Sequence, residues 1–152
     1  VFVYGILRPL HGRIETLIGR NKTNRQKMSA DVARGKEAIT NYETLEVFKG
    51  SKILDISLVK CMLETGRTHQ IRVHMSHKGN PILGDQTYGK KIKKLRGVDQ
   101  KFEDILKSLK RQALHAHTLG FVHPKTNQDV FYASELPEDL NKLKNRLETL
   151  KN

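Results

Sequence analysis

The sequence has no tryptophan, one cysteine and few aromatic residues, which make up 6% of its 152 positions. The lone cysteine, Cys61, excludes an internal disulfide framework and is typical of a reducing compartment, so we expect a cytoplasmic protein. There is no run of about eighteen apolar residues, so no membrane partner is expected. With 37% hydrophobic residues, the composition is that of one globular domain of ordinary size, not of a collagen or a disordered chain.

Acidic residues are also in short supply, with 16 against 28 basic ones, giving a net charge of +12 and a pI near 9.9. The positive charge is uneven. Residues 1–36 carry +6 and residues 66–101 carry +7, whereas residues 37–65 carry −2 and residues 102–152 carry +1. A balance of this kind favours nucleic acid or an anionic surface as a partner.

Each of the two basic blocks contains a dense cluster. Residues 19–27, here called the basic loop, are polar and rich in turn formers, and residues 90–96 hold five cations in seven positions. One such cluster alone is equally consistent with a solvated surface run. Two clusters in a strongly basic chain favour contacts with RNA phosphates, which carry no base information.

Alternating apolar residues predict several strands joined by short turns. Residues 36–64 are expected to form an antiparallel hairpin, in which Leu54, Ile56, Leu58 and Met62 mark the buried face of the second strand. The expected fold class is α+β, with a mixed, mainly antiparallel sheet and a few flanking helices. The other predicted strands span residues 1–4, 13–18, 113–122 and 129–134, the last two as a hairpin around a turn at 124–127.

Three helices are predicted. Thr68 is a candidate N-cap for a helix over 69–78, and a second short helix is expected over 102–110. The third begins at Pro137, with acidic residues in its first turn. Leucines at 140, 143, 147 and 150 give it one apolar face, which favours packing on the body over binding a partner.

The segment over residues 64–74 concentrates two arginines, two histidines, a glutamine and a threonine around Gly66. Arg67 is expected in the turn before the helix, where it could reach a carboxylate or a phosphate with two hydrogen bonds. Exposed backbone amides at a helix start also attract anions. A surface helix whose arginine merely holds a loop is the alternative.

This segment resembles the signature of RNA pseudouridine synthases of the branch that acts on ribosomal and transfer RNA. The match reads Leu-Glu-Thr-Gly-Arg-Thr-His-Gln-Ile-Arg-Val-His-Met over residues 63–75, then Gly-Asn-Pro-Ile-Leu-Gly-Asp over 79–85 and Tyr-Gly at 88–89. Similar motifs extend the resemblance over essentially the whole chain: residues 18–20, 25–28, 35–42, 111–116, 121–124 and 136–140.

The resemblance implies isomerisation of uridine in RNA, with large-subunit ribosomal RNA as the expected partner, a monomeric state and no metal or organic cofactor. The family's catalytic aspartate lies in a His-Arg-Leu-Asp motif that residues 1–152 do not contain. If the glycine that follows the family's active-site tyrosine is aligned with Gly5, that tyrosine would fall just before Val1. We therefore expect the C-terminal portion of a catalytic domain, without its N-terminal RNA-binding domain and inactive by itself.

The resemblance also assigns roles to individual residues. Arg67 is the expected partner of the absent aspartate. The remaining candidates fall into two groups, contacts to RNA and apolar packing beneath the base. The first group is His69, Gln70, Arg72, Arg20, Arg25 and Lys27, and the second is Leu63 and Ile71.

Three other interpretations remain open. The chain could be an RNA-binding module without catalysis, which the charge supports equally well. Asp85 could replace the missing aspartate, although a glycine-flanked aspartate is more typical of a turn. A histidine-ligated metal site could form at His115 and His117, or at 69, 74 and 77, although the usual ligand spacing with cysteine or carboxylate is missing.

Overall fold

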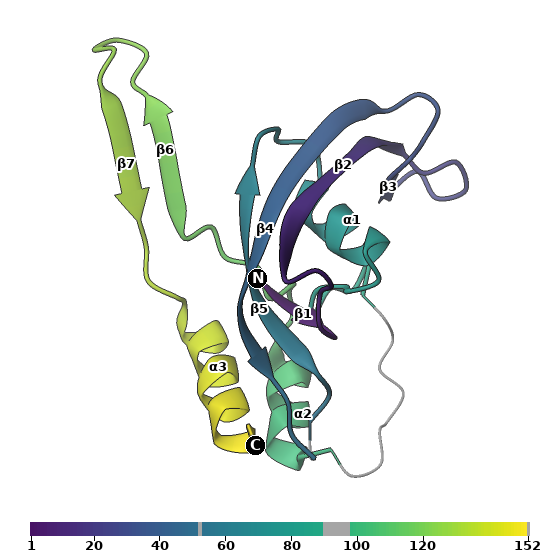
Figure 1. Cartoon of the computed structure of the whole chain (residues 1–152), viewed down its shortest axis with the longest axis vertical. Coiled ribbons are helices and arrows are strands. Elements are labelled where there is room, and N and C mark those ends of the chain that lie inside the picture. Colours follow the sequence, from purple (N-terminus) through teal and green to yellow (C-terminus); the bar gives the residue numbers. More distant parts are fainter. Residues whose placement is uncertain (52, 90–97, 152) are drawn as a thin grey trace.

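The computed structural model describes residues 1–51, 53–89 and 98–151. Its main layer is a curved five-stranded sheet whose strands pair antiparallel in the order β1-β5-β4-β2-β3 (Figure 1). The predicted α+β class and the mainly antiparallel sheet are confirmed. The strands are β1 (Phe2–Tyr4), β2 (His11–Arg20), β3 (Met28–Ser29), β4 (Lys36–Phe48) and β5 (Ile56–Leu63).

The long strands β2 and β4 form the middle of this sheet and follow the sequence pattern. In β2, Ile14, Thr16 and Ile18 are buried and alternate with exposed neighbours, as a strand with one covered face requires. The register of β4 against β5 shifts between Thr44 and Glu46, and such an irregularity bends a strand.

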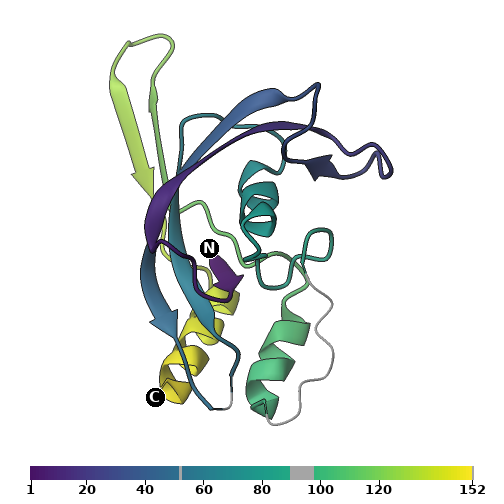
Figure 2. The same ribbon diagram turned by 45° about the vertical axis from the view of Figure 1, so that its right-hand side comes forward.

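Three helices cover parts of the sheet. α1 (Gln70–His77) lies against the curved β2–β4 region, while α2 (Gln100–Ser108) and α3 (Glu138–Leu150) lie at the other end of the molecule (Figure 2). Leu140, Leu143 and Leu147 of α3 are fully buried in the main core. The interpretation of this helix as one packed on the body is confirmed.

The predicted second hairpin forms from β6 (Thr118–Val122) and β7 (Asp129–Ala133), and it projects away from the body (Figure 1). Its side chains are exposed or half-buried along both strands. One prediction about the first hairpin was wrong. Met62 was expected on the buried face, but it is largely exposed, because β5 runs beyond the core at its C-terminal end.

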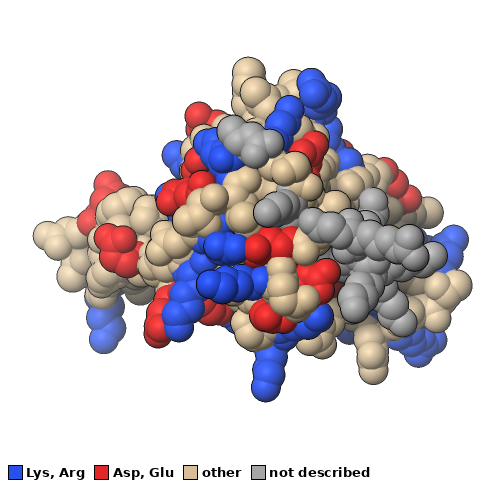
Figure 3. All heavy atoms as spheres, turned by 90° about the horizontal axis from the view of Figure 1, so that it is seen from below, with Lys and Arg blue, Asp and Glu red and all other residues tan. Residues whose placement is uncertain are grey.

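The end of the molecule that carries α2 and α3 shows lysine, arginine and acidic side chains interspersed (Figure 3). This distribution agrees with the near-zero net charge of residues 102–152. The predicted basic cluster at 90–96 lies outside the described residues. Within the described ranges, none of the helices has the length and apolar character needed to span a membrane.

Candidate functional site

Residues 64–69, here called the site loop, connect β5 to α1. The predicted cap at Thr68 was wrong: His69 is the N-cap residue, in a left-handed conformation with φ 58°, and its side chain makes no capping bond. The side chain of Gln70 instead holds the loop that precedes the helix. Its Oε1 accepts a hydrogen bond from the Arg67 amide at 2.9 Å and another from the Thr65 hydroxyl at 2.8 Å.

Gln70 belongs to a chain of buried hydrogen bonds, here called the polar network, made by Thr16, Thr40, Gln70 and His74. The Gln70 Nε2 donates to the Ile39 carbonyl at 2.9 Å and to Thr40 Oγ1 at 3.0 Å. Thr40 Oγ1 lies 2.8 Å from His74 Nδ1, and His74 Nε2 lies 2.9 Å from Thr16 Oγ1. The network therefore ties the site loop and α1 to both β2 and β4.

The burial of this network decides how two of its members act. Gln70 is 3% exposed and its amide is used by protein partners, so it supports the site loop from inside the protein instead of offering a surface for RNA. Burial, with a smaller effect of His77, lowers the pKa of His74 to about 4. His74 is therefore neutral at physiological pH, which matches its two hydroxyl partners.

Arg67 lies in the site loop, where the sequence predicts it. Its Nε donates to the Glu37 carbonyl of β4 at 2.7 Å, which fixes the direction of the half-buried side chain. Among the residues that the structure describes, no ion pair joins Arg67 to a carboxylate. Its role as partner of an aspartate stays a prediction.

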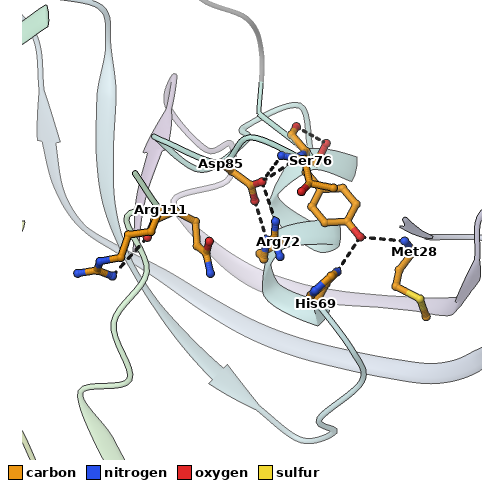
Figure 4. Close-up of polar contacts among 9 residues, drawn as sticks. Met28, His69, Arg72, Ser76, Asp85 and Arg111 are labelled. Carbon is orange, nitrogen blue, oxygen red and sulfur yellow. Dashed lines mark hydrogen bonds and ion pairs between the residues drawn. The ribbon is translucent and has the colours of Figure 1, made fainter. Parts of the chain in front are cut away.

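Arg72 is held by a buried carboxylate. Its Nε and Nη2 donate to the two oxygens of Asp85 at 2.8 and 2.9 Å, with the side chains 13% and 0% exposed (Figure 4). The guanidinium also lies 4.9 Å from the ring centroid of Tyr88. The predicted RNA contact of Arg72 is untested, and its guanidinium already has these protein partners.

Asp85 has the surroundings of a structural turn residue. It also accepts hydrogen bonds from the amides of Thr87 and Tyr88, at 2.9 and 3.0 Å. Burial alone would raise the pKa of Asp85, but the hydrogen bonds from Arg72 and these amides hold it below its usual value. A carboxylate so fully engaged is a poor candidate for a nucleophile.

The turn after α1 also brings in a residue of the matching motifs to which sequence analysis gave no role. Tyr88 Oη accepts a hydrogen bond from the Met28 amide at 2.8 Å and lies 3.0 Å from His69 Nδ1 (Figure 4). The rings of His69 and Tyr88 meet edge to face, with centroids 5.6 Å apart. Nothing in the local sequence signals this contact, because Tyr88 and Met28 are sixty residues apart.

The basic loop is shaped by its own polar side chains. Asn21 Oδ1 accepts hydrogen bonds from the amides of Thr23 and Asn24, both at 2.9 Å. These bonds form a turn of the kind that asparagine favours. Met28 directly follows the basic loop, so its contact with Tyr88 fastens the end of that loop beside the site loop. Of its predicted RNA contacts, Arg20 and Arg25 are exposed and Lys27 is half-buried.

The two residues predicted to pack beneath a base differ in exposure. Leu63, at the end of β5, is 50% exposed, while Ile71 is partly buried against the main core. Leu63 is thus the more accessible of the two. Neither role is tested by the structure.

The histidines do not gather into a ligand set in the part of the chain that the structure describes, where no group of three or more His, Cys, Asp or Glu could hold a metal ion. Both ring nitrogens of His74 face hydroxyls. His115 and His117 lie near one another, and each has a ring nitrogen at the Ser134 carbonyl.

Comparison with known proteins gives consistent matches. The family model described as RNA pseudouridylate synthase matches residues 3–77. Ribosomal large subunit pseudouridine synthase D of Zymomonas mobilis is 41% identical over 86% of this chain and 38% of its own length. An uncharacterized RNA pseudouridine synthase of Bacillus subtilis, YlyB, is 42% identical over 93% of this chain and 40% of its own length.

Solved structures agree at the level of the fold. Human RNA pseudouridylate synthase domain containing 1 has a TM-score of 0.65 and 25% identity, covering 99% of this chain and 64% of that one. Human RNA pseudouridylate synthase domain containing 4 has a TM-score of 0.68 at 23% identity, and the match covers 97% of this chain and 60% of that one. The chain thus spans less than half the length of the two bacterial relatives and less than two thirds of these human chains.

Proposed function

The chain belongs to the RNA pseudouridine synthase family, and on this premise we propose that it forms part of an enzyme that isomerises uridine within RNA. In this reaction the bond between N1 and C1′ breaks, the base turns, and C5 bonds to C1′. The hydrogen on C5 leaves as a proton and N1 gains one, so the composition of the nucleotide is unchanged. The target base must leave its stack to be reached.

The observation that carries the proposal is identity near 40% over most of this chain to proteins named for this activity. The placement of Arg67 supports it. A backbone carbonyl and the Gln70 amide fix this arginine at the start of α1, where it can pair with a carboxylate supplied from outside these residues. Such a pair would keep that carboxylate ionised and oriented.

The proposed substrate is large-subunit ribosomal RNA, because several relatives carry that substrate in their names. The basic loop would bind the RNA backbone through Arg20, Arg25 and Lys27. The 152 residues alone would bind RNA without isomerising it, since they contain no His-Arg-Leu-Asp motif.

The test uses large-subunit ribosomal RNA labelled with tritium at C5 of uridine. We expect the protein encoded by the complete reading frame to release tritium to water, and the 152-residue chain to bind the RNA without release. In the complete protein, Arg67→Met should abolish release, while Arg8→Met, at an exposed arginine away from the site loop, should not. Absence of release by the complete protein would contradict the proposal and favour the non-catalytic RNA-binding alternative.

A further inference from the structure

Tyr88 connects three segments through one side chain. Its hydroxyl meets Met28 at the base of the basic loop and His69 at the end of the site loop (Figure 4). The residue itself is held in the turn after α1, where its amide donates to Asp85 and its ring lies beside the Arg72 guanidinium. The Tyr88 side chain is thus held in place by the buried ion pair of Arg72 and Asp85.

The partners of the hydroxyl limit where its proton can go. The Met28 amide has only a hydrogen to give, so the tyrosine oxygen accepts there. Among the residues that the structure describes, the remaining partner of the hydroxyl is His69 Nδ1. An oxygen that accepts from the Met28 amide still has its own proton to give, and donation of that proton to Nδ1 would place the proton of a neutral His69 on Nε2.

The backbone of His69 makes this contact more significant. A residue other than glycine at φ 58° is held in a sparsely populated conformation, and such residues persist where their surroundings fix them. The side chain of His69 makes no capping bond to α1. In the described part of the chain, the ring contact with Tyr88 is the interaction of the His69 side chain that can hold this conformation.

We propose that Tyr88 is a positioning residue that keeps the His69 proton on Nε2 and fastens the basic loop beside the site loop. His69 then presents a neutral N–H donor suited to an oxygen acceptor on RNA. The part of this inference that concerns RNA rests on the proposed function, whereas the tautomer of His69 does not.

Among residues 1–51, 53–89 and 98–151, the charged and titratable groups that face His69 are Arg72 on α1 and, in the following turn, Asp85 and Tyr88. Burial lowers the pKa of His69, Arg72 lowers it further, and Asp85 opposes the shift. A hydroxyl that donates to Nδ1 also favours the neutral ring. Loss of this hydroxyl should therefore raise the pKa of His69.

The first experiment is nitrogen-15 NMR of the histidine rings in the 152-residue chain and in its Tyr88→Phe variant. We expect His69 in the unmodified chain to be protonated on Nε2 alone, and the variant to show mixed tautomers and a higher pKa for His69. Tyr42→Phe is the matched control, since it removes a phenol hydroxyl bonded to the Pro9 carbonyl and should leave His69 unchanged. A proton on Nδ1 in the unmodified chain would overturn the proposal even if Tyr88→Phe fails to fold.

The second experiment measures binding of the same three proteins to large-subunit ribosomal RNA at fixed low salt. The loss of one hydrogen bond should weaken binding by Tyr88→Phe roughly two- to tenfold, and Tyr42→Phe should bind like the unmodified chain. Equal binding by all three would overturn the fastening role of Tyr88. No binding by the unmodified chain would instead contradict the proposed function, and NMR would still decide the tautomer.

Discussion

The α1 face of the sheet and the β6–β7 hairpin use side chains in opposite ways. At α1, polar side chains are buried and bonded to one another, as Gln70 and His74 show. On the hairpin, apolar side chains such as Phe131 and Tyr132 lie in solvent, 71% and 60% exposed. The first region is fixed by side chains from several elements, and the second by the ladder between its own two strands.

This difference indicates which region of the molecule is rigid. An unsatisfied buried polar group is costly, so the polar network allows one arrangement of the site loop. A two-stranded hairpin without further support has marginal stability. The candidate site is therefore expected to be far more rigid than the hairpin, and the following experiments test that contrast.

The largest effect is expected from the buried ion pair. Asp85→Ala leaves Arg72 buried without its carboxylate and should lower the free energy of unfolding by about 3–5 kcal/mol. Arg13→Ala, which breaks two ion pairs between exposed side chains, with Glu15 and Glu64, should cost about 1 kcal/mol or less. Urea unfolding measures both, and similar losses would contradict the contrast.

The next effect depends on pH. His74 has a pKa of about 4 in the folded chain and an ordinary value of 6.5, so the unfolded chain binds a proton that the folded chain does not. The contribution of neutral His74 to the free energy of unfolding is fully present above about pH 6.5. It is lost as the pH falls towards 4, and the loss is about 3 kcal/mol in all.

His74→Gln, which keeps hydrogen-bonding groups at this position, should remove most of this dependence. The comparison requires urea unfolding of both proteins at several values between pH 7 and pH 4.5. Parallel curves for the two proteins would show that His74 is not the titrating group.

A smaller effect is expected from the Gln70 side chain, which supports the site loop. Gln70→Ala leaves the Arg67 amide and the Thr65 hydroxyl without their acceptor and should cost about 1–3 kcal/mol. Gln26→Ala, in the exposed part of the basic loop, should change stability by less than about 0.5 kcal/mol. Thermal unfolding of the two variants separates these outcomes, and equal midpoints would argue against a supporting role for Gln70.

The smallest effect is expected in the hairpin. Phe131→Ser should change the free energy of unfolding by less than about 0.5 kcal/mol, because the side chain is already in solvent. Hydrogen exchange of the unmodified chain should be fast at the β6–β7 amides and slow at those of β4. Equal protection in both regions would mean that the hairpin is covered, and the contrast would then fail.

The sequence predicted those elements whose pattern is local. β4 and β5 form the antiparallel hairpin predicted over 36–64, and the leucine spacing located α3. The orientation of α1 was harder to predict. Gln70 was assigned to contacts with RNA, although Gln70, Val73 and His74 have the spacing of a buried helix face.

The contacts that organise the site could not be predicted from local pattern. Arg72 meets a carboxylate thirteen residues later, and the partner of Tyr88 lies sixty residues earlier in the chain. Periodicity reports which face of an element is apolar, not which distant group completes a hydrogen bond. Of the wrong predictions, the one at Thr68 placed the cap of the helix one residue too early, and the one at Met62 followed an alternation that β5 continues beyond the core.

The polar network also has a consequence for the order of folding. The bond between Thr16 and His74 closes a loop of 58 residues, and that between Met28 and Tyr88 one of 60. Contacts between residues so distant form late, because the chain must lose entropy before they stabilise it. Hairpins form within microseconds. We therefore expect the folding chain to acquire its exposed hairpin early and to complete the geometry of its site last.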